Sequence, residues 1–165
     1  MKVIVVYESH YGNTAAVARA IADGFGPEAQ VLDTDEASPT VVVDADMIVA
    51  GAPVMAFNLP SDRMLATMAG DKKAPTPPEL SHASMRSWLD GLAAGRGRFA
   101  AFETGLRWSP GGATGAIDDK LERAGFRRLA RSRRFVVKGS YGPLRDGELE
   151  RAKEWGSELA AAMTA

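Results

Sequence analysis

A polar turn, Glu8-Ser9-His10-Tyr11-Gly12-Asn13-Thr14, follows the first apolar run of the chain and precedes its first helical pattern. Ser9 and Thr14 bring hydroxyl groups, and Asn13 brings an amide. Gly12 has no Cβ, so an anion can approach the backbone closely. A turn that leads from a strand into a helix aims unpaired N–H groups and the positive end of the helix dipole at one point. The turn therefore indicates a phosphate-binding site.

The same seven residues also fit a plain helix start, in which Asn13 or Thr14 caps the first turn of the helix. The turn contains no Lys, and it lacks the second Gly of the dinucleotide fingerprint G-x-G-x-x-G and of the nucleoside-triphosphate loop. If the turn binds phosphate, a single terminal phosphate is favoured over a pyrophosphate or a triphosphate. The local spacing leaves the capping and the phosphate-binding interpretations open.

The composition limits the chemistry that the chain can perform. Its 165 residues are 45% hydrophobic with a net charge of −1, so we expect residues 1–165 to form a single globular domain. The absence of cysteine excludes disulfides, thiol redox chemistry and cysteine-ligated iron–sulfur sites. A redox function would need a bound organic cofactor. The N-terminal apolar run is too short for a signal peptide or a membrane span, so we expect a cytoplasmic protein without membrane contact.

Charge is distributed unevenly along the chain. The first 60 residues hold two basic and eight acidic residues, whereas residues 123–134 hold six arginines and no acid. Such a cluster is typical of a solvated helix end and strand, and a docking patch for an acidic partner is the alternative. Nucleic-acid binding is not predicted, because the net charge is slightly negative and only Phe126 and Phe135 interleave the arginines.

Strands and helices that alternate along the chain must position the polar turn. Residues 70–81, which hold two lysines and three prolines, are predicted to form a loop. The alternation predicts an α/β fold with a parallel sheet that helices cover on both faces. The expected strands are residues 2–7, 30–33, 46–51, 98–103 and 128–138, the last irregular near Ser132. The expected helices are 14–25, a weak one over 35–42 that Pro39 breaks, 61–69, 84–92, 113–124 and a last one capped by Asp146.

The first strand and the turn, Val3 to Thr14, together resemble the first strand and the FMN-phosphate loop of flavodoxins. Ser9, Gly12 and the Asn13-Thr14 pair match the family pattern, whereas Tyr11 replaces its middle hydroxyl residue. The resemblance implies a flavodoxin-like three-layer sandwich with a five-stranded parallel sheet in the order 2-1-3-4-5. It also implies FMN as the cofactor, with Ser9, His10, Tyr11, Gly12, Asn13 and Thr14 around its phosphate.

Residues 135–144 and 147–156 are also similar to flavodoxin-family proteins of the actinobacterial type, so the resemblance covers nearly the full chain. In a sheet of order 2-1-3-4-5, ligands bind outside the carboxyl ends of the strands, between strands one and three. Three loops meet at that edge, namely residues 9–14, 52–60 and 104–112.

The second of these loops resembles the flavodoxin loop that packs an apolar side chain against the inner flavin face. Met55 or Phe57 would supply that side chain, although Phe57 fits a role in the core equally well. The loop contains no Gly between Val54 and Asn58, and Val54 resists the left-handed conformation that Asn58 tolerates. In flavodoxins, which this loop resembles, a backbone carbonyl that turns toward the flavin, commonly at a Gly, stabilises the one-electron-reduced form, so the resemblance implies weak stabilisation of that form here. The residues of this loop assigned to the cofactor site are Pro53, Val54, Met55, Ala56 and Phe57.

The third loop falls where the family places its outer aromatic side chain and its contacts to the pyrimidine edge. Trp108 would stack on the flavin, with a surface or core role as the alternative. Arg107 would donate to a flavin carbonyl or attract a partner. The loop lacks the acidic residue that electron-carrier flavodoxins usually have there. The residues assigned to the site are Thr104, Gly105, Leu106, Arg107 and Trp108.

The resemblance favours an FMN-binding flavodoxin-like electron-transfer protein over a stand-alone enzyme. Its partner would be a redox protein, either a flavin reductase or an electron acceptor, and the chain would be a monomer or a homodimer. No general acid, base or metal site is required, so His10 and His82 are expected to be surface residues. Two alternatives stay open. One is an FMN-dependent quinone or NAD(P)H oxidoreductase with a substrate pocket under residues 70–81 or at a dimer interface, and the other is a binding module that has lost FMN.

Overall fold

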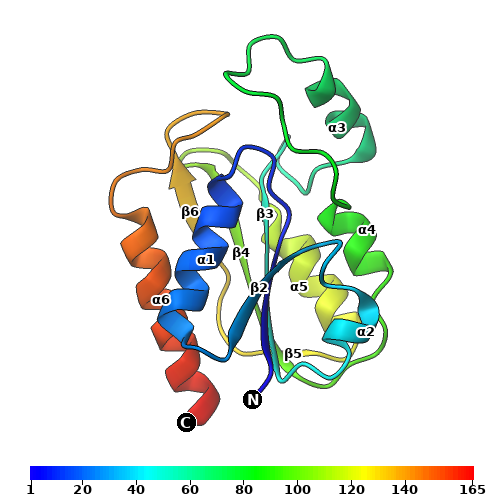
Figure 1. The fold of residues 1–165 in the computed structure, drawn as a ribbon, viewed down its shortest axis with the longest axis vertical. Coiled ribbons are helices and arrows are strands. Elements are labelled where there is room, and N and C mark those ends of the chain that lie inside the picture. Colours follow the sequence, from blue (N-terminus) through cyan, green and yellow to red (C-terminus); the bar gives the residue numbers. More distant parts are fainter.

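The computed structural model describes residues 1–165 and is built around one parallel sheet. The order of its strands, β2-β1-β3-β4 with β5 and β6 beyond β4, confirms the predicted order 2-1-3-4-5 (Figure 1). Every pairing in the sheet is parallel, as the alternation of strands and helices predicts. The strands are β1 (Val3–Tyr7), β2 (Ala29–Asp33), β3 (Met47–Pro53), β4 (Arg98–Leu106), β5 (Arg127–Arg128) and β6 (Arg133–Val137).

The predicted fifth strand consists of two short segments that pair with the two ends of β4. β5 pairs with the start of β4, and β6 pairs with residues 102–106 at its carboxyl end. The irregularity predicted near Ser132 lies between the two segments. Because β6 pairs so far along β4, that strand continues to Leu106, three residues beyond its predicted end. Thr104 and Gly105 therefore lie on the strand and not in the loop that follows it.

Helices cover both faces of the sheet, which confirms the three-layer α/β fold. α1 (Asn13–Phe25) and α6 (Glu148–Thr164) cover one face, and α2 (Pro39–Val42), α4 (Met85–Asp90) and α5 (Thr114–Arg123) cover the other. The eight residues of α3 (Asp62–Ala69) include no buried side chain, and the helix projects beyond the carboxyl edge of the sheet (Figure 1). No helix in the structure has both the length and the apolar character that a membrane span requires.

The core consists of two apolar layers, one on each side of the sheet. Val3 and Val5 point into the layer under α1 and α6, whereas Ile4 and Val6 point into the opposite layer, as the alternation of side chains along a strand requires. This run of four buried apolar residues fixes β1 in the centre of the sheet. The turn that follows β1 is thereby held at the middle of the carboxyl edge.

Close backbone packing holds α1 against α6. A Cβ on Gly24 would lie 1.8 Å from the carbonyl oxygen of Lys153, and a Cβ on Gly156 would lie 2.0 Å from that of Ile21. Neither position can hold a side chain, so the two helices touch through their backbones. The prediction that Asp146 caps α6 is wrong. The N-cap is Gly147 in a left-handed conformation, and the side chain of Asp146 is fully exposed.

Candidate cofactor site at the carboxyl edge of the sheet

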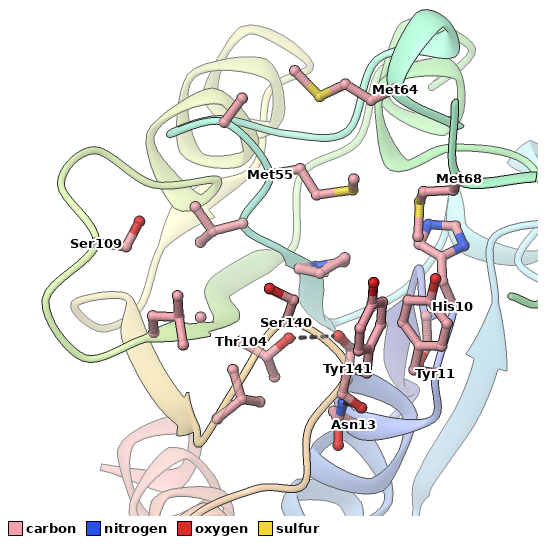
Figure 2. A pocket seen from close by; sticks show the side chains of 18 of the residues that line it. His10, Tyr11, Asn13, Met55, Met64, Met68, Thr104, Ser109, Ser140 and Tyr141 are labelled. Carbon is pink, nitrogen blue, oxygen red and sulfur yellow. Dashed lines mark hydrogen bonds between the residues drawn. The ribbon is translucent and has the colours of Figure 1, made fainter. Parts of the chain in front are cut away.

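A cavity of about 570 Å³ opens at the carboxyl ends of β1, β3 and β4 (Figure 2). The three loops that were predicted to meet at this edge all contribute to its lining. Every predicted site residue lines the cavity except Gly12 and Arg107. Gly12 caps α1 with its backbone, and Arg107 is exposed.

The cavity is also lined by two segments that the sequence analysis did not assign to the site. Met64 and Met68 of α3 form part of its wall, and in Figure 2 they lie on the same side as Met55. Their spacing of four residues places them on one helix face, which is the only local signal that could have found them. The other unassigned lining residues are Asp71, Ser109, Val137, Ser140 and Tyr141.

The turn after β1 forms one end of the cavity and presents unused hydrogen-bonding groups. Gly12 is left-handed, with φ 90°, and the amides of Thr14 and Ala15 find no acceptor in the chain. The hydroxyl oxygens of Ser9 and Tyr11 are buried and also have no partner. Buried polar groups are normally paired. A phosphate group could accept hydrogen bonds from such unpaired donors beside an open helix N-terminus.

The capping interpretation of this turn is wrong. Neither Asn13 nor Thr14 caps α1, because the N-cap is Gly12 and no side chain bonds to the first helical amides. The Asn13 side chain instead donates to the carbonyl of Tyr141 at 3.2 Å. The Thr14 hydroxyl bonds to that of Thr104 at 2.7 Å, which ties α1 to β4 (Figure 2). The helix N-terminus thus stays open toward the cavity.

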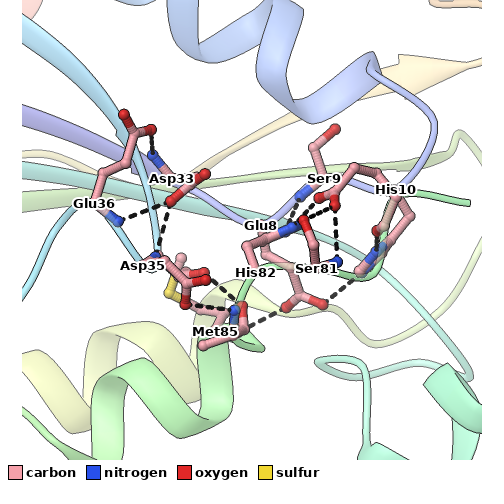
Figure 3. Close-up of polar contacts among 12 residues, drawn as sticks. Glu8, Ser9, His10, Asp33, Asp35, Glu36, Ser81, His82 and Met85 are labelled. Atoms are coloured by element: carbon pink, nitrogen blue, oxygen red, sulfur yellow. Dashed lines mark hydrogen bonds and ion pairs between the residues drawn. The ribbon is translucent and has the colours of Figure 1, made fainter.

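A buried polar network joins the turn of residues 8–14 to residues 79–85 (Figure 3). The prediction that both histidines are surface residues is wrong, since His10 and His82 are buried and stack with ring centroids 5.4 Å apart. Glu8 is fully buried. One of its oxygens accepts from the Met85 amide at 2.8 Å, and the other lies 2.6 Å from His10 Nε2.

The contacts of His10 assign its protonation. His10 Nε2 faces the Glu8 carboxylate and Nδ1 faces the Glu79 carbonyl at 2.7 Å, so both nitrogens donate and the ring is charged. Burial by itself lowers the pKa of His10, but the hydrogen bonds to Glu8 and Glu79 outweigh burial and raise it. His82 Nε2 accepts from the Ser9 amide at 3.1 Å, and its Nδ1 faces the Glu79 carboxylate. The network fastens residues 79–85 to the turn and fixes its shape.

The second loop forms a tight hairpin turn that contains no glycine. Met55 and Asn58 exchange backbone hydrogen bonds at 2.8 and 3.0 Å, and the two residues between them, Ala56 and Phe57, have φ values of 45° and 70°. The left-handed positions thus fall on these two residues and not on Asn58. The alternative that Phe57 fills the core is wrong, because 59% of its surface is exposed at the cavity rim.

The third loop places Trp108 at the rim of the cavity with 77% of its surface exposed. The alternative that Trp108 belongs to the core is therefore wrong. An exposed ring at a cavity mouth presents a large apolar face to a planar ligand or to a partner. Arg107 beside it is exposed and is not among the residues that line the cavity.

An aromatic pair forms a further wall of the cavity. Tyr141 donates its hydroxyl to Asp71 at 2.5 Å, and this bond, followed by burial, raises the pKa of Tyr141. The Tyr11 ring meets the Tyr141 ring edge-on, with centroids 5.2 Å apart. These contacts join the loop after α3 to the loop between β6 and α6, and so close one side of the cavity.

The family model for flavodoxins matches residues 5–155 of the chain. The chain belongs to the flavodoxin family. Membership in this family implies flavin binding, typically of FMN, and the open helix N-terminus with the unpaired hydroxyls of Ser9 and Tyr11 fits the phosphate of such a cofactor. A curated protein from Synechocystis sp. (strain ATCC 27184 / PCC 6803 / Kazusa), described as a putative diflavin flavoprotein, is 36% identical over 67 residues. The matched part is 36% of this chain and only 11% of that protein.

Solved structures share the fold over the whole chain. A flavodoxin from the domain Archaea aligns over 100% of both chains, with a TM-score of 0.69 and 23% identity. Oxidised flavodoxin 1 from Bacillus cereus aligns over 98% of both chains, with a TM-score of 0.68 and 19% identity. The flavodiiron core of a Synechocystis sp. PCC6803 protein aligns over 99% of this chain and 36% of the flavodiiron chain, with a TM-score of 0.65 and 21% identity. At these identities the likeness establishes the fold alone.

Proposed function

We propose that this flavodoxin-family protein binds FMN through its terminal phosphate and transfers electrons to or from a redox partner protein. The observation that carries the proposal is the turn of residues 9–14, where the first amides of α1 and two buried hydroxyl groups have no partner, and where no Lys or second Gly is present. When bound, FMN supplies the electron-transfer chemistry, and the chain supplies binding, orientation and electrostatics.

The residues of the chain have separable tasks in this proposal. The Ser9 and Tyr11 hydroxyls and the first amides of α1 bind the phosphate. Met55 and Trp108, on the second and third loops, face the ring system. The apolar walls keep water from the ring, and the network behind the turn holds the phosphate loop in its binding shape. No side chain is required as a general acid, base or nucleophile.

The partner in this proposal is a flavin reductase or an electron acceptor. Phe57 and Trp108 are among the few large apolar side chains that are exposed, and both lie at the cavity rim. Exposed aromatic side chains are enriched at the centres of protein interfaces. Electron transfer through this rim would therefore combine a docking surface with access to the flavin.

One observation favours a second candidate, an FMN-dependent quinone or NAD(P)H oxidoreductase. Met64 and Met68 of α3 extend the cavity beyond the three flavin loops, and methionine side chains adapt to ligands of varied shape. An enzyme of this kind would reduce a quinone with NAD(P)H without any partner protein. Turnover of the purified holoprotein with NAD(P)H and a quinone would favour this candidate over the electron carrier.

The proposal is tested by flavin retention in two matched variants. Gly12 and Gly147 are both left-handed N-cap residues, with φ and ψ of 90° and −8° and of 86° and −9°, and an added Cβ meets nothing within 4 Å at either position. Gly12→Asp places a carboxylate where the phosphate would bind, whereas Gly147→Asp adds the same charge and strain at the start of α6.

We expect the wild-type protein, loaded with FMN and freed of excess, to keep the absorption bands of oxidised flavin through gel filtration. Gly147→Asp should behave alike, and Gly12→Asp should bind FMN about 100-fold more weakly, because like charges would be brought together. A wild-type protein that fails to retain FMN, or equal binding by the two variants, contradicts the proposal.

A further inference from the structure

One arginine of the cluster 123–134 points into the protein and contacts the third loop of the cavity. Arg123, Arg128 and Arg133 form ion pairs with acidic residues of α5 and α6. Arg134 on β6 instead stands beside Glu103 on β4, which is its register partner in the sheet. The side chains of this pair are mostly buried.

Arg134 binds the backbone of the third loop at three points. Its Nε donates to Glu103 Oε2 at 2.6 Å. One terminal nitrogen donates to the carbonyls of Leu106 and Ser109 at 3.0 and 2.7 Å, and the other donates to that of Gly111 at 2.7 Å. A guanidinium presents five N–H donors in a fixed fork, so one side chain sets the relative positions of three carbonyls. Lysine, whose donors share one nitrogen, cannot reach all of these groups at once.

Glu103 holds the far end of the same loop. Its Oε1 accepts from the amides of Ala113 and Thr114 at 2.9 and 3.1 Å, at the start of α5. The N-cap residue of α5, Ala113, has no side-chain oxygen of its own, so the carboxylate from β4 takes the place of a cap. Gly112 makes this contact possible, since a Cβ there would come within 2.6 Å of Glu103 Oε1.

The third loop in turn supports the second loop. The Gly112 amide donates to the carbonyl of Phe57 at 2.9 Å, so it fixes the end of the left-handed turn. Gly111 lies directly against this turn, because a Cβ there would be 2.6 Å from the same carbonyl oxygen. The position of residues 106–113 therefore also determines where Phe57 lies at the cavity rim.

We propose that Arg134, acting with Glu103, is a positioning residue that fixes residues 106–113 and through them both aromatic side chains of the cavity rim, Phe57 and Trp108. Its effect on cofactor affinity rests on the proposed function, whereas its effect on the loop does not. Arg134 itself does not line the cavity. Its guanidinium would act on a bound flavin only through the loop backbone that positions Trp108 and Phe57.

Arg134→Lys tests the proposal, with Arg133→Lys as the matched control. Both changes keep the charge on β6 and remove a guanidinium, but Arg133 pairs with the surface carboxylate of Glu158 at 2.7 Å and makes no contact with the loop. A readout that needs no flavin is tryptic cleavage after Arg107 in the third loop. Cleavage after Lys73, in the exposed loop that follows α3, serves as the internal reference.

We expect cleavage after Arg107, relative to Lys73, to rise about tenfold in Arg134→Lys, the effect of losing one hydrogen bond to a charged group. The dissociation constant for FMN should rise by a similar factor, and the visible circular dichroism of bound flavin should change. Arg133→Lys should match the wild-type protein in all three. A general loss of stability would raise cleavage at every tryptic site that opens only on global unfolding, and not after Arg107 alone.

Unchanged relative cleavage in a folded Arg134→Lys variant overturns the proposal, whatever the affinity for FMN. If relative cleavage rises in Arg134→Lys but the wild-type protein never retains FMN, the proposed function is wrong and the positioning role of Arg134 is supported. If Arg134→Lys does not fold, hydrogen exchange in the wild-type protein decides.

The amides of Gly112, Ala113 and Thr114 have acceptors, whereas those of Ala74 and Thr76 have none in the chain. The amides of Gly112, Ala113 and Thr114 should exchange at least about tenfold more slowly than those of Ala74 and Thr76. Equal exchange rates would overturn the proposal that Arg134 and Glu103 fix this loop.

Discussion

The left-handed turn at Ala56 and Phe57 stores strain that a glycine would release. A residue with a Cβ costs about 1–2 kcal/mol in this conformation, whereas a glycine adds about 0.4–1 kcal/mol of chain entropy to the unfolded state. The midpoints of these two ranges differ by about 0.8 kcal/mol, so Ala56→Gly should raise the free energy of unfolding by about 0.5–1 kcal/mol. For a chain of this size, the melting temperature should rise by about 1–4 °C. Ala56 is exposed, so its methyl group contributes little burial that the change would remove.

Ala94→Gly is the matched control for this prediction. Ala94 is also an exposed loop alanine, between α4 and β4, but its φ is not positive. A glycine there gains nothing in the folded state and makes the unfolded chain more flexible, so the free energy of unfolding should fall by about 0.4–1 kcal/mol. The two alanine-to-glycine changes therefore have opposite signs.

Urea denaturation followed by far-UV circular dichroism measures both variants under identical conditions. If the slope against urea is unchanged, a shift in midpoint reports stability directly. Equal destabilisation by Ala56→Gly and Ala94→Gly would refute the reasoning, because it would mean that no left-handed strain is stored in the turn. Strain of this kind is typical of functional sites, where the surrounding structure holds it in place. Here the bond from the Gly112 amide to the Phe57 carbonyl does so.

Two further predictions concern protons and electrons. The pKa of His10 is raised in the folded protein, so its contribution to stability is fully present below the ordinary value of 6.5 and is lost as pH rises through the folded pKa. Urea denaturation at a series of pH values should show the free energy of unfolding falling across this window in the wild-type protein, and that fall should be absent in His10→Gln. In a reductive titration of the FMN-loaded protein, we expect no long-lived blue radical. The carbonyls of Met55 and Phe57 already accept backbone hydrogen bonds, so neither is free to turn toward a one-electron-reduced flavin. Accumulation of the blue radical would contradict this expectation.

The sequence predicted the fold well because its signals are local. Buried apolar runs such as Val3–Val6 identify the strands of a parallel sheet, and the helices between them follow from spacing. The strand order came from the resemblance to flavodoxins. Boundaries depend on partners, and the end of β4 at Leu106 is set by its pairing with β6. The prediction of a single domain over residues 1–165 stays a prediction.

The site was predicted where its residues follow the strands directly, and missed where distant segments meet. Ser9, Pro53 and Thr104 line the cavity because each lies at the carboxyl end of its strand. His10 and His82 each have a carboxylate partner nearby in sequence, Glu8 and Glu79, but their burial comes from the meeting of two distant segments. The bonds from His10 to the Glu79 carbonyl and from the Ser9 amide to His82 join those segments. No local pattern encodes such a meeting, so the sequence favoured exposure for both histidines.

The two buried ion pairs of the site share one physical logic. Glu8 with His10 lies within the turn of residues 8–14, and Glu103 with Arg134 lies behind the third loop. Buried pairs contribute little net stability, since desolvation offsets much of their attraction. Each pair also forms hydrogen bonds to backbone groups. Glu8 and His10 bond to the Met85 amide and the Glu79 carbonyl. Arg134 and Glu103 bond to the backbone of the third loop and the start of α5. Their structural role then lies in fixing two loops whose own sequences do not determine their shape. Under the proposed function, cofactor binding would then be tuned from behind the cavity wall, because Glu8, Glu103 and Arg134 do not line the cavity.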